Sequence, residues 1–203
     1  MTLVIGLTGS IATGKSTISK LFNQHSIPVI DADVIARRVV EPNQPAYKKV
    51  VRAFGENILD DDLTIDRPKL ANVIFHDPNK RQELESIVHP EIIDQLKKER
   101  DALIKENVPL IVLDIPLLFE KKLDDLVDIV LVVYTEKSKQ LKRLIDRDHF
   151  SKEEAQKRID SQISIDKKAQ KADVVIDNSA SLEQTKHQFD RLLNQWLNGK
   201  GNE

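Results

Sequence analysis

The sequence predicts an α/β fold in which a parallel sheet lies between two layers of helices. Five short runs are continuously apolar and rich in β-branched residues, and longer segments with helical spacing separate them. The runs cover residues 3–8, 29–31, 110–115, 129–135 and 174–177. Strands that are apolar on both faces are typical of parallel sheets with helices on both sides, so we expect three layers.

Two long stretches interrupt the alternation of strands and helices. Residues from about 41 to 107 contain five prolines that divide them into several short helices and one longer charged helix. Residues from about 137 to 171 form a charged helical segment. No repeat or Gly/Ser linker separates either stretch, so we expect one domain with its core at about 1–40, 108–136 and 172–198. We expect residues 199–203 to be disordered.

Composition excludes several classes of function. The 203 residues include no cysteine, which excludes a disulfide scaffold, a thiolate zinc site and thiol catalysis. The 31 basic and 33 acidic residues give a net charge of -2, so we expect no nucleic-acid partner. No apolar run is long enough for a bilayer span or a signal-peptide core. We therefore expect a cytoplasmic protein without a membrane role, a monomer or a weak oligomer.

The strongest chemical signal is the glycine-rich segment at residues 9–16, which reads Gly-Ser-Ile-Ala-Thr-Gly-Lys-Ser. It has the spacing of a phosphate-binding loop and lies between a strand pattern and a helix pattern, which is the context that such a loop needs. Successive main-chain N–H groups and the helix N-terminus would bind a polyphosphate. The sequence therefore predicts a P-loop NTPase fold that binds ATP. The alternative, a chance glycine turn before a helix, does not account for the strand and the helix around it.

Each residue type in the loop has an expected role. Lys15 would reach the β- and γ-phosphates, Ser16 would coordinate Mg²⁺, and Thr17 would hydrogen-bond the α-phosphate. The candidate nucleotide-binding residues are Gly9, Ala12, Thr13, Gly14, Lys15, Ser16 and Thr17.

Carboxylates follow two of the predicted strands. Asp114 ends the third run and is a candidate to hold Mg²⁺ through water, although a buried strand that ends in aspartate is common. Asp31 and Asp33 end the second run, about 20 residues after the loop. Phosphoryl transfer to a hydroxyl requires a carboxylate that orients and deprotonates the nucleophile, so Asp33 is the candidate base. Either aspartate has the alternative of capping the next helix, and we favour a structural or metal-assisting role for Asp31.

Two arginines in the second helical stretch suit a charged transition state. Arg143 and Arg147 are four residues apart and so share a helix face, where a guanidinium can stabilise charge on phosphate oxygens. The alternative is an ordinary solvated basic face. Arg158 and Gln162, also one turn apart, are interpreted as part of the same framework or as phosphate contacts.

Further motifs occur in an order and spacing that resemble the dephospho-CoA kinases, P-loop kinases related to the nucleoside monophosphate kinases. The resemblance covers residues 3 to 197. The matching motifs are Gly6-Leu7-Thr8-Gly9 with the loop, Asp31-Ala32-Asp33 with Ala36-Arg37, Leu84-Glu85, His89-Pro90, Pro116-Leu117-Leu118-Phe119-Glu120, Arg143, Arg147-Asp148, Arg158 with Gln162, Ala172-Asp173 and Asp177-Asn178.

The resemblance implies ATP-dependent phosphorylation of the ribose 3′-hydroxyl of dephospho-CoA to give coenzyme A and ADP, the last step of coenzyme A synthesis. It implies that residues 41–107 bind the acceptor and that residues 137–171 form a lid. Catalytic roles would fall to Lys15, Asp33, Arg143 and Arg147, and Asn178 would contact adenine. The implied acceptor-binding residues are Thr8, Asp33, Arg37, His89, Pro116, Leu117, Leu118 and Glu120.

The chain departs from that family at three places. Such kinases usually carry glycine where this chain has Ser10 and Ala12, and again after Asn178. The main-chain donors survive these changes, but a side chain restricts φ where glycine would not.

Two other functions stay open on sequence grounds. A P-loop kinase for nucleoside monophosphates or shikimate would share the sheet and the loop, and the phosphate acceptor distinguishes it. A nucleotide-dependent switch that binds a protein partner is the second alternative. The absence of an Asn-Lys-x-Asp guanine signature and the presence of Asp33 argue against the switch.

Overall fold

The computed structural model describes residues 2–75 and 77–198, and the predicted disorder of residues 199–203 lies outside them. The chain divides into two compact units. The first comprises Met1–Ile30 and Arg100–Glu203, and the second comprises Asp31–Glu99. The stretch expected to bind the acceptor, about residues 41–107, overlaps the second unit. The assignment of core, acceptor region and lid by function stays a prediction.

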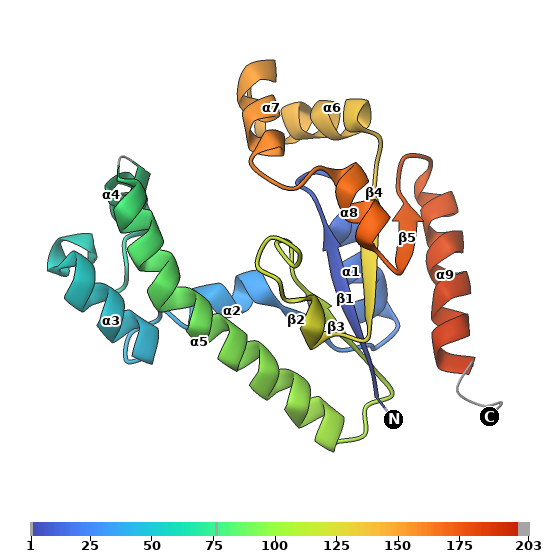
Figure 1. The fold of residues 1–203 in the computed structure, drawn as a ribbon, viewed down its shortest axis with the longest axis horizontal. Helices are drawn as coiled ribbons and strands as arrows, with labels where there is room; N and C mark the ends of the chain where they lie inside the picture. Colours follow the sequence, from blue (N-terminus) through green and yellow to red (C-terminus); the bar gives the residue numbers. More distant parts are fainter. Residues whose placement is uncertain (1, 76, 199–203) are drawn as a thin grey trace. The chain divides into compact units, whose positions relative to one another are not determined.

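A five-stranded sheet forms the centre of the first unit, with the strand order β2-β3-β1-β4-β5 (Figure 1). The strands are β1 (Leu3–Gly9), β2 (Val29–Asp31), β3 (Leu110–Asp114), β4 (Ile129–Tyr134) and β5 (Val174–Asp177). β1 pairs in parallel with β3 and β4, and β4 pairs in parallel with β5. The prediction of a parallel sheet built from these five runs is confirmed.

Helices cover the sheet because its strands are apolar on both faces. On one face, α1 (Lys15–Gln24) and α9 (Leu182–Asn198) contribute to the main apolar core. Phe22 of α1 meets Phe189 edge-to-face with ring centroids 4.8 Å apart, and the Trp196 ring stacks on Phe22 at 6.3 Å. Trp196 therefore anchors the last helix. On the sheet itself, a Cβ at Gly6 would come within 2.7 Å of Leu118, so only glycine lets this side chain pack so closely.

The segment expected to be a helical lid forms three helices in the first unit. They are α6 (Lys137–Asp148), α7 (Lys152–Asp160) and α8 (Ile165–Lys171), and the short 3-10 helix η2 (Asp124–Leu126) precedes β4. Ser151 and Glu154 form a reciprocal capping box at the start of α7, and the Ser164 hydroxyl accepts from the Lys167 N–H at the start of α8. Along residues 2–75 and 77–198, no helix is long and apolar enough to cross a membrane.

The second unit is helical, and proline marks where three of its helices begin. It contains α2 (Ala32–Arg38), α3 (Pro45–Phe54), the 3-10 helix η1 (Glu56–Ile58), α4 (Arg67–Phe75) and the larger part of α5 (Pro78–Lys105). Pro45 and Pro78 are first residues of helices and Pro68 is a second residue, where the missing N–H costs nothing. Pro90 instead lies inside α5, which runs on through it.

Candidate active site

The phosphate loop joins β1 to α1 through a hydrogen-bonded turn. The Ser10 carbonyl accepts from the Thr13 N–H at 3.2 Å and from the Thr13 hydroxyl at 2.9 Å. Gly14 has φ +94°, which glycine adopts without strain, and Ala12 has φ 61°. An L-residue in this left-handed region costs about 1–2 kcal/mol, so Ala12 keeps the loop shape at an expense that the usual glycine would avoid.

Lys15, the penultimate residue of the motif, contacts a buried carboxylate. Its ammonium forms an ion pair with Asp114, whose side chain is 2% exposed at the end of β3. Leu7 of β1 pairs in register with Asp114, so the sheet sets the carboxylate beside the strand that leads into the loop. The structure thus brings together two residues that the sequence predicted for phosphate and metal binding. Ser16 follows Lys15 directly, and its side chain is exposed.

Three side chains tie the loop to the predicted lid segment. The Gln140 amide donates to the Ile11 carbonyl at 2.8 Å, and the Gln162 amide oxygen accepts from the Ile11 N–H at 2.9 Å. The Ser10 hydroxyl donates to the Ile163 carbonyl at 3.2 Å. Ser10, a departure from the family pattern, therefore adds a bond that glycine could not form. Gln162 contacts the loop main chain, whereas Gln140 belongs to no motif and was not predicted.

Asn178, which was expected to contact adenine, instead forms a hydrogen bond to the main chain of the phosphate loop. It is 8% exposed, and its amide nitrogen donates to the Thr13 carbonyl at 2.9 Å. Its amide oxygen accepts from the Thr185 hydroxyl of α9, also at 2.9 Å. A Cβ on Gly14 would overlap the Asn178 amide nitrogen, so the two residues pack directly. Contact with adenine stays a prediction, and the structure gives this side chain a supporting role.

The two predicted lid arginines differ in their surroundings. Arg143 donates to the Asn178 carbonyl at 2.9 Å and to the Thr135 hydroxyl at 3.4 Å. Arg147 forms a bidentate pair with its neighbour Asp148, at 2.8 and 2.9 Å. That hydrogen bonding lowers the pKa of Asp148 and raises the pKa of Arg147. Arg143 is therefore held next to a residue that supports the loop, while Arg147 lies at the C-terminal end of α6.

The turn after β3 holds several predicted acceptor residues. The Thr8 hydroxyl donates to the Pro116 carbonyl at 3.1 Å, which joins β1 to this turn. Leu118 is fully buried against the sheet, while Leu117 is 36% exposed. Glu120 accepts from the Ile163 N–H at 3.1 Å and forms an ion pair with Lys168 at 2.8 Å. Lys168 was missed, because a lysine in a charged helix gives no sequence sign of burial.

At the start of the second unit, the carboxylates of Asp31 and Asp33 make different contacts. The Asp31 carboxylate caps α2 by accepting from the N–H groups of Asp33 at 2.8 Å and Val34 at 3.2 Å. The Asp33 side chain is exposed. Within residues 2–75 and 77–198 its carboxylate has no hydrogen-bond or ion-pair partner, which leaves it available for a substrate.

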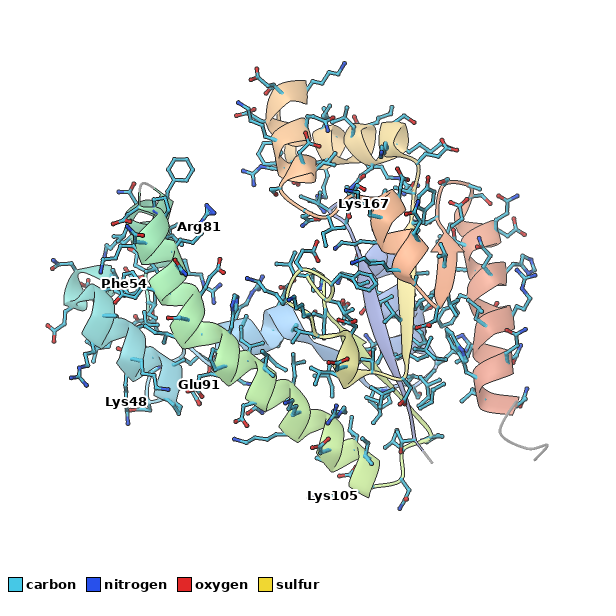
Figure 2. All side chains as sticks on the ribbon, in the orientation of Figure 1. Lys48, Phe54, Arg81, Glu91, Lys105 and Lys167 are labelled. Atoms are coloured by element: carbon cyan, nitrogen blue, oxygen red, sulfur yellow. The ribbon has the colours of Figure 1, made fainter. Side chains whose placement is uncertain are left out.

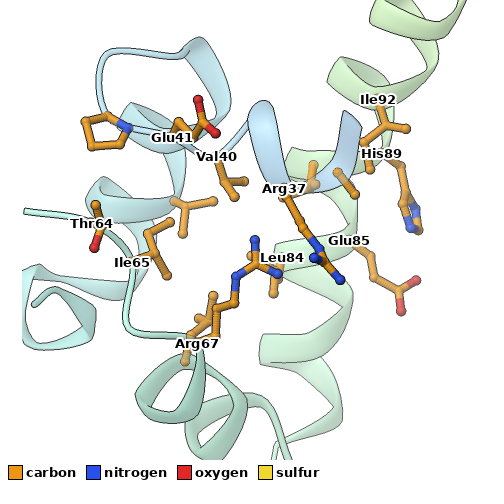
Figure 3. Close-up of a pocket in the computed structure, with 15 residues that line it drawn as sticks. Arg37, Val40, Glu41, Thr64, Ile65, Arg67, Leu84, Glu85, His89 and Ile92 are labelled. Carbon is orange, nitrogen blue, oxygen red and sulfur yellow. The ribbon is translucent and has the colours of Figure 1, made fainter. Parts of the chain in front are cut away.

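A cavity of about 480 Å³ lies within the second unit. Arg37 and His89, both predicted acceptor residues, line it together with Arg67, and the guanidinium groups of Arg37 and Arg67 point into the same space (Figure 3). The rest of the lining is mostly apolar, and it includes Val40, Val50, Ile65, Leu84, Val88 and Ile92. Arg67 was not predicted, because a lone arginine after a turn carries no motif.

Comparison with known proteins identifies the family. The family model described as dephospho-CoA kinase matches residues 3–184. Dephospho-CoA kinases of Bacillus cereus and Oceanobacillus iheyensis are each 52% identical over 196 residues, 97% of this chain and 98% of the relative. A solved dephospho-CoA kinase from Campylobacter jejuni is 33% identical with a TM-score of 0.78, covering 98% of this chain and all of the other.

A shikimate kinase from Acinetobacter baumannii, 16% identical with a TM-score of 0.55 over 100% of this chain and 97% of the other, shares the fold alone. The predicted P-loop fold and the resemblance noted in the sequence are both confirmed. This chain belongs to the dephospho-CoA kinase family, whose members phosphorylate dephospho-CoA with ATP in the final step of coenzyme A synthesis.

Proposed function

We propose that this protein transfers the terminal phosphate of ATP to the ribose 3′-hydroxyl of dephospho-CoA, with Asp33 as the base. The observation that carries the proposal is the phosphate loop, whose Lys15 contacts the buried Asp114. Phosphoryl transfer needs little covalent chemistry from the protein, so catalysis is mainly a matter of positioning groups and stabilising charge.

The loop supplies the donor side of the reaction. The main-chain N–H groups of Ala12, Gly14, Lys15 and Ser16 would bind the phosphates, since those of Thr13 and Thr17 donate to carbonyls within the loop. The Lys15 ammonium would stabilise charge on the β- and γ-oxygens. The fixed turn at Thr13 and Gly14 supports this role, because donors that are already oriented need no reorganisation during the reaction.

Mg²⁺ fits the oxygen donors that flank Lys15. The Ser16 hydroxyl and the Asp114 carboxylate are hard oxygen ligands, and Mg²⁺ in kinases is usually held by one or two such side chains together with phosphates and water. The bound ion would neutralise charge on the phosphate oxygens.

Asp33 would accept the proton of the acceptor hydroxyl. Asp31 has already taken the capping role at the start of α2, which frees the Asp33 carboxylate from that task. Arg143 and Arg147, both in the predicted lid, would stabilise charge on the transferred phosphate. Arg147 would first have to break its hydrogen bonds to Asp148.

The cavity of the second unit suits the acceptor. Dephospho-CoA carries a diphosphate and a long, largely apolar pantetheine arm, and the cavity combines two arginines with an apolar lining. Among the described residues, neither Arg37 nor Arg67 has an ion-pair partner, so both guanidinium groups are available to an anion. Glu41 and Glu85 also line the cavity, so a bound diphosphate would occupy the part beside the two guanidinium groups, where it gains their attraction. His89 lines the same cavity.

The sequence predictions of a cytoplasmic protein that is a monomer or a weak oligomer and binds no nucleic acid belong to this proposal as well. The net charge of -2 supports the last part, because a protein that binds nucleic acid usually presents a basic field. Light scattering during size-exclusion chromatography tests the monomer directly.

The test uses an analogue of dephospho-CoA in which hydrogen replaces the ribose 3′-hydroxyl. We expect ADP release and coenzyme A formation with dephospho-CoA, and no phosphorylated product with the 3′-deoxy analogue. The analogue should still compete with dephospho-CoA, because the diphosphate and the pantetheine arm are intact. Phosphorylation of the analogue, or phosphate found by NMR at any other hydroxyl of the normal product, would overturn the proposal.

A further inference from the structure

The one fully buried lysine among the described residues lies beside the phosphate loop. Lys168 of α8 is 0% exposed, and its ammonium donates to the Gly9 carbonyl at 3.1 Å and to the Pro116 carbonyl at 2.9 Å. It also pairs with Glu120 at 2.8 Å. An ammonium has three donor hydrogens, and these three acceptors use all of them. No donor is left for a substrate, so Lys168 acts through the groups that it holds.

The three partners of Lys168 belong to the segments that build the site. Gly9 is the first residue of the phosphate loop, and Pro116 is two residues beyond Asp114. The Glu120 carboxylate also accepts from the Ile163 N–H, just before α8. Lys168 therefore joins the entry of the loop, the turn after β3 and the end of the predicted lid at one atom.

We propose that Lys168 is a positioning residue for phosphoryl transfer, whose ammonium sets the spacing between the phosphate loop and the turn at residues 116–120. This inference rests on the proposed function only for the identity of the acceptor. The loop binds the nucleotide whichever acceptor is used, so nucleotide affinity gives a separate readout.

The free energy of folding alone does not explain why a charged lysine is buried at this position. Burial lowers the pKa of Lys168, while the Glu120 carboxylate acts in the opposite direction and the charge of Lys15 adds to the lowering. One Glu120 oxygen, Oε2, is buried and has no hydrogen-bond partner in the described part of the chain. A buried ion pair is often replaced by apolar side chains at no loss of stability. What apolar side chains cannot supply is one donor that fixes two main-chain carbonyls and a carboxylate together.

The experiment compares Lys168→Met with Lys167→Met, its neighbour on α8. Lys167 is exposed to solvent and is labelled in Figure 2. Lys168→Met alone leaves the partly buried Glu120 carboxylate without its counter-ion, with only the Ile163 N–H as a partner, and is expected to lower the melting temperature. The double variant Lys168→Met/Glu120→Gln removes that charge, and Glu120→Gln alone serves as its reference, so the effect of losing the ammonium is separated from the effect of losing the ion pair.

Three quantities are measured for each variant: the melting temperature, the ATP affinity by calorimetry without acceptor, and kcat with dephospho-CoA. We expect the double variant to melt at a lower temperature than Glu120→Gln, because the Gly9 and Pro116 carbonyls lose a donor. It should also bind ATP more weakly and lose about 10²-fold in kcat, the usual effect of a misplacement near 1 Å. Lys167→Met should match the wild type in all three.

Each outcome decides one question. If the double variant equals Glu120→Gln in both ATP affinity and kcat, Lys168 is only structural and the inference is wrong. If the wild type itself does not phosphorylate dephospho-CoA, the proposed function fails, and the ATP affinities of the same variants still decide the role of Lys168.

Discussion

Gly14→Ala is the substitution whose cost follows most directly from the structure. Gly14 has φ +94°, and an alanine held there costs about 1–2 kcal/mol of backbone strain. The new methyl group would overlap the Asn178 amide nitrogen, so the amide must move and give up its bonds to Thr13 and Thr185. Each such bond contributes about 0.5–1.5 kcal/mol net, which brings the loss of unfolding free energy to roughly 2–5 kcal/mol.

That loss translates into a drop in melting temperature of roughly 4–20 °C for a chain of this length. Once the Thr13 carbonyl loses the Asn178 amide, the main-chain donors of the loop are no longer held in place. The ATP dissociation constant should therefore rise by about tenfold or more, because one hydrogen bond to a charged phosphate contributes about 1.5–3 kcal/mol.

Gly55→Ala is the matched control. Gly55 also has a positive φ, +80°, but a Cβ there would meet nothing within 4 Å. The control should lose about 1–3 kcal/mol from backbone strain and leave ATP binding unchanged. Calorimetry for ATP and thermal unfolding measure both effects. If Gly14→Ala binds ATP as tightly as Gly55→Ala does, then Asn178 does not support the loop in the way described.

Three further predictions concern the base, the acceptor cavity and a helix cap. Asp33→Asn should lower kcat by about 10²–10⁴ while calorimetry shows unchanged ATP affinity, and an unchanged kcat would remove Asp33 from the role of base. Arg67→Ala should raise the KM for dephospho-CoA by about 10–100-fold, the loss of one charge-assisted hydrogen bond, without changing the KM for ATP. Arg81→Ala, which lies outside the cavity lining in the same unit (Figure 2), should behave like the wild type, and equal KM values for both variants would contradict the assignment. Hydrogen bonds from Ser151 lower the pKa of Glu154 below its ordinary 4.5, so this carboxylate stabilises the fold above that pH, and the stabilisation is lost as the pH falls through the lowered pKa. Glu154→Gln should therefore lower the melting temperature at neutral pH and match the wild type in acid, and a difference that persists in acid would contradict this reasoning.

The sequence was sufficient to predict the sheet and the loop because both carry dense local signals. Each strand is a run of apolar residues with a sharp end, and a strand, glycine turn and helix in succession define the phosphate loop. Asp31 was also predictable as a helix cap, because aspartate is one of the residues preferred at the position directly before a helix.

Other features of the site depend on contacts across long stretches of chain. The bonds from Gln140 and Gln162 to Ile11, and from Lys168 to Gly9, join residues more than 120 positions apart. Gln162 was singled out by its spacing from Arg158, but its bond to Ile11 was not predicted. Nothing marks Gln140 or Lys168, because glutamine and lysine are ordinary residues in charged helices. The use of the Asn178 amide was hidden for the same reason, since an asparagine after a strand reads as a turn residue.

Ser10 and Ala12 show how one departure from a family pattern can be neutral and another costly. Ser10 gains a hydrogen bond to Ile163, which offsets the freedom that glycine would have had. Ala12 is strained at φ 61°, and its methyl group forms no hydrogen bond that would offset the strain. The first effect depends on a distant partner, so only the structure reveals it.

The most direct test of the account is a coupled ADP-release assay with the purified protein, ATP and Mg²⁺. It compares dephospho-CoA with AMP, CMP, shikimate and no acceptor, and the mass of each product is checked. The proposed function predicts ADP release with dephospho-CoA alone and a product heavier by one phosphate group. Release that is equal without acceptor, or transfer to another acceptor in place of dephospho-CoA, would contradict it.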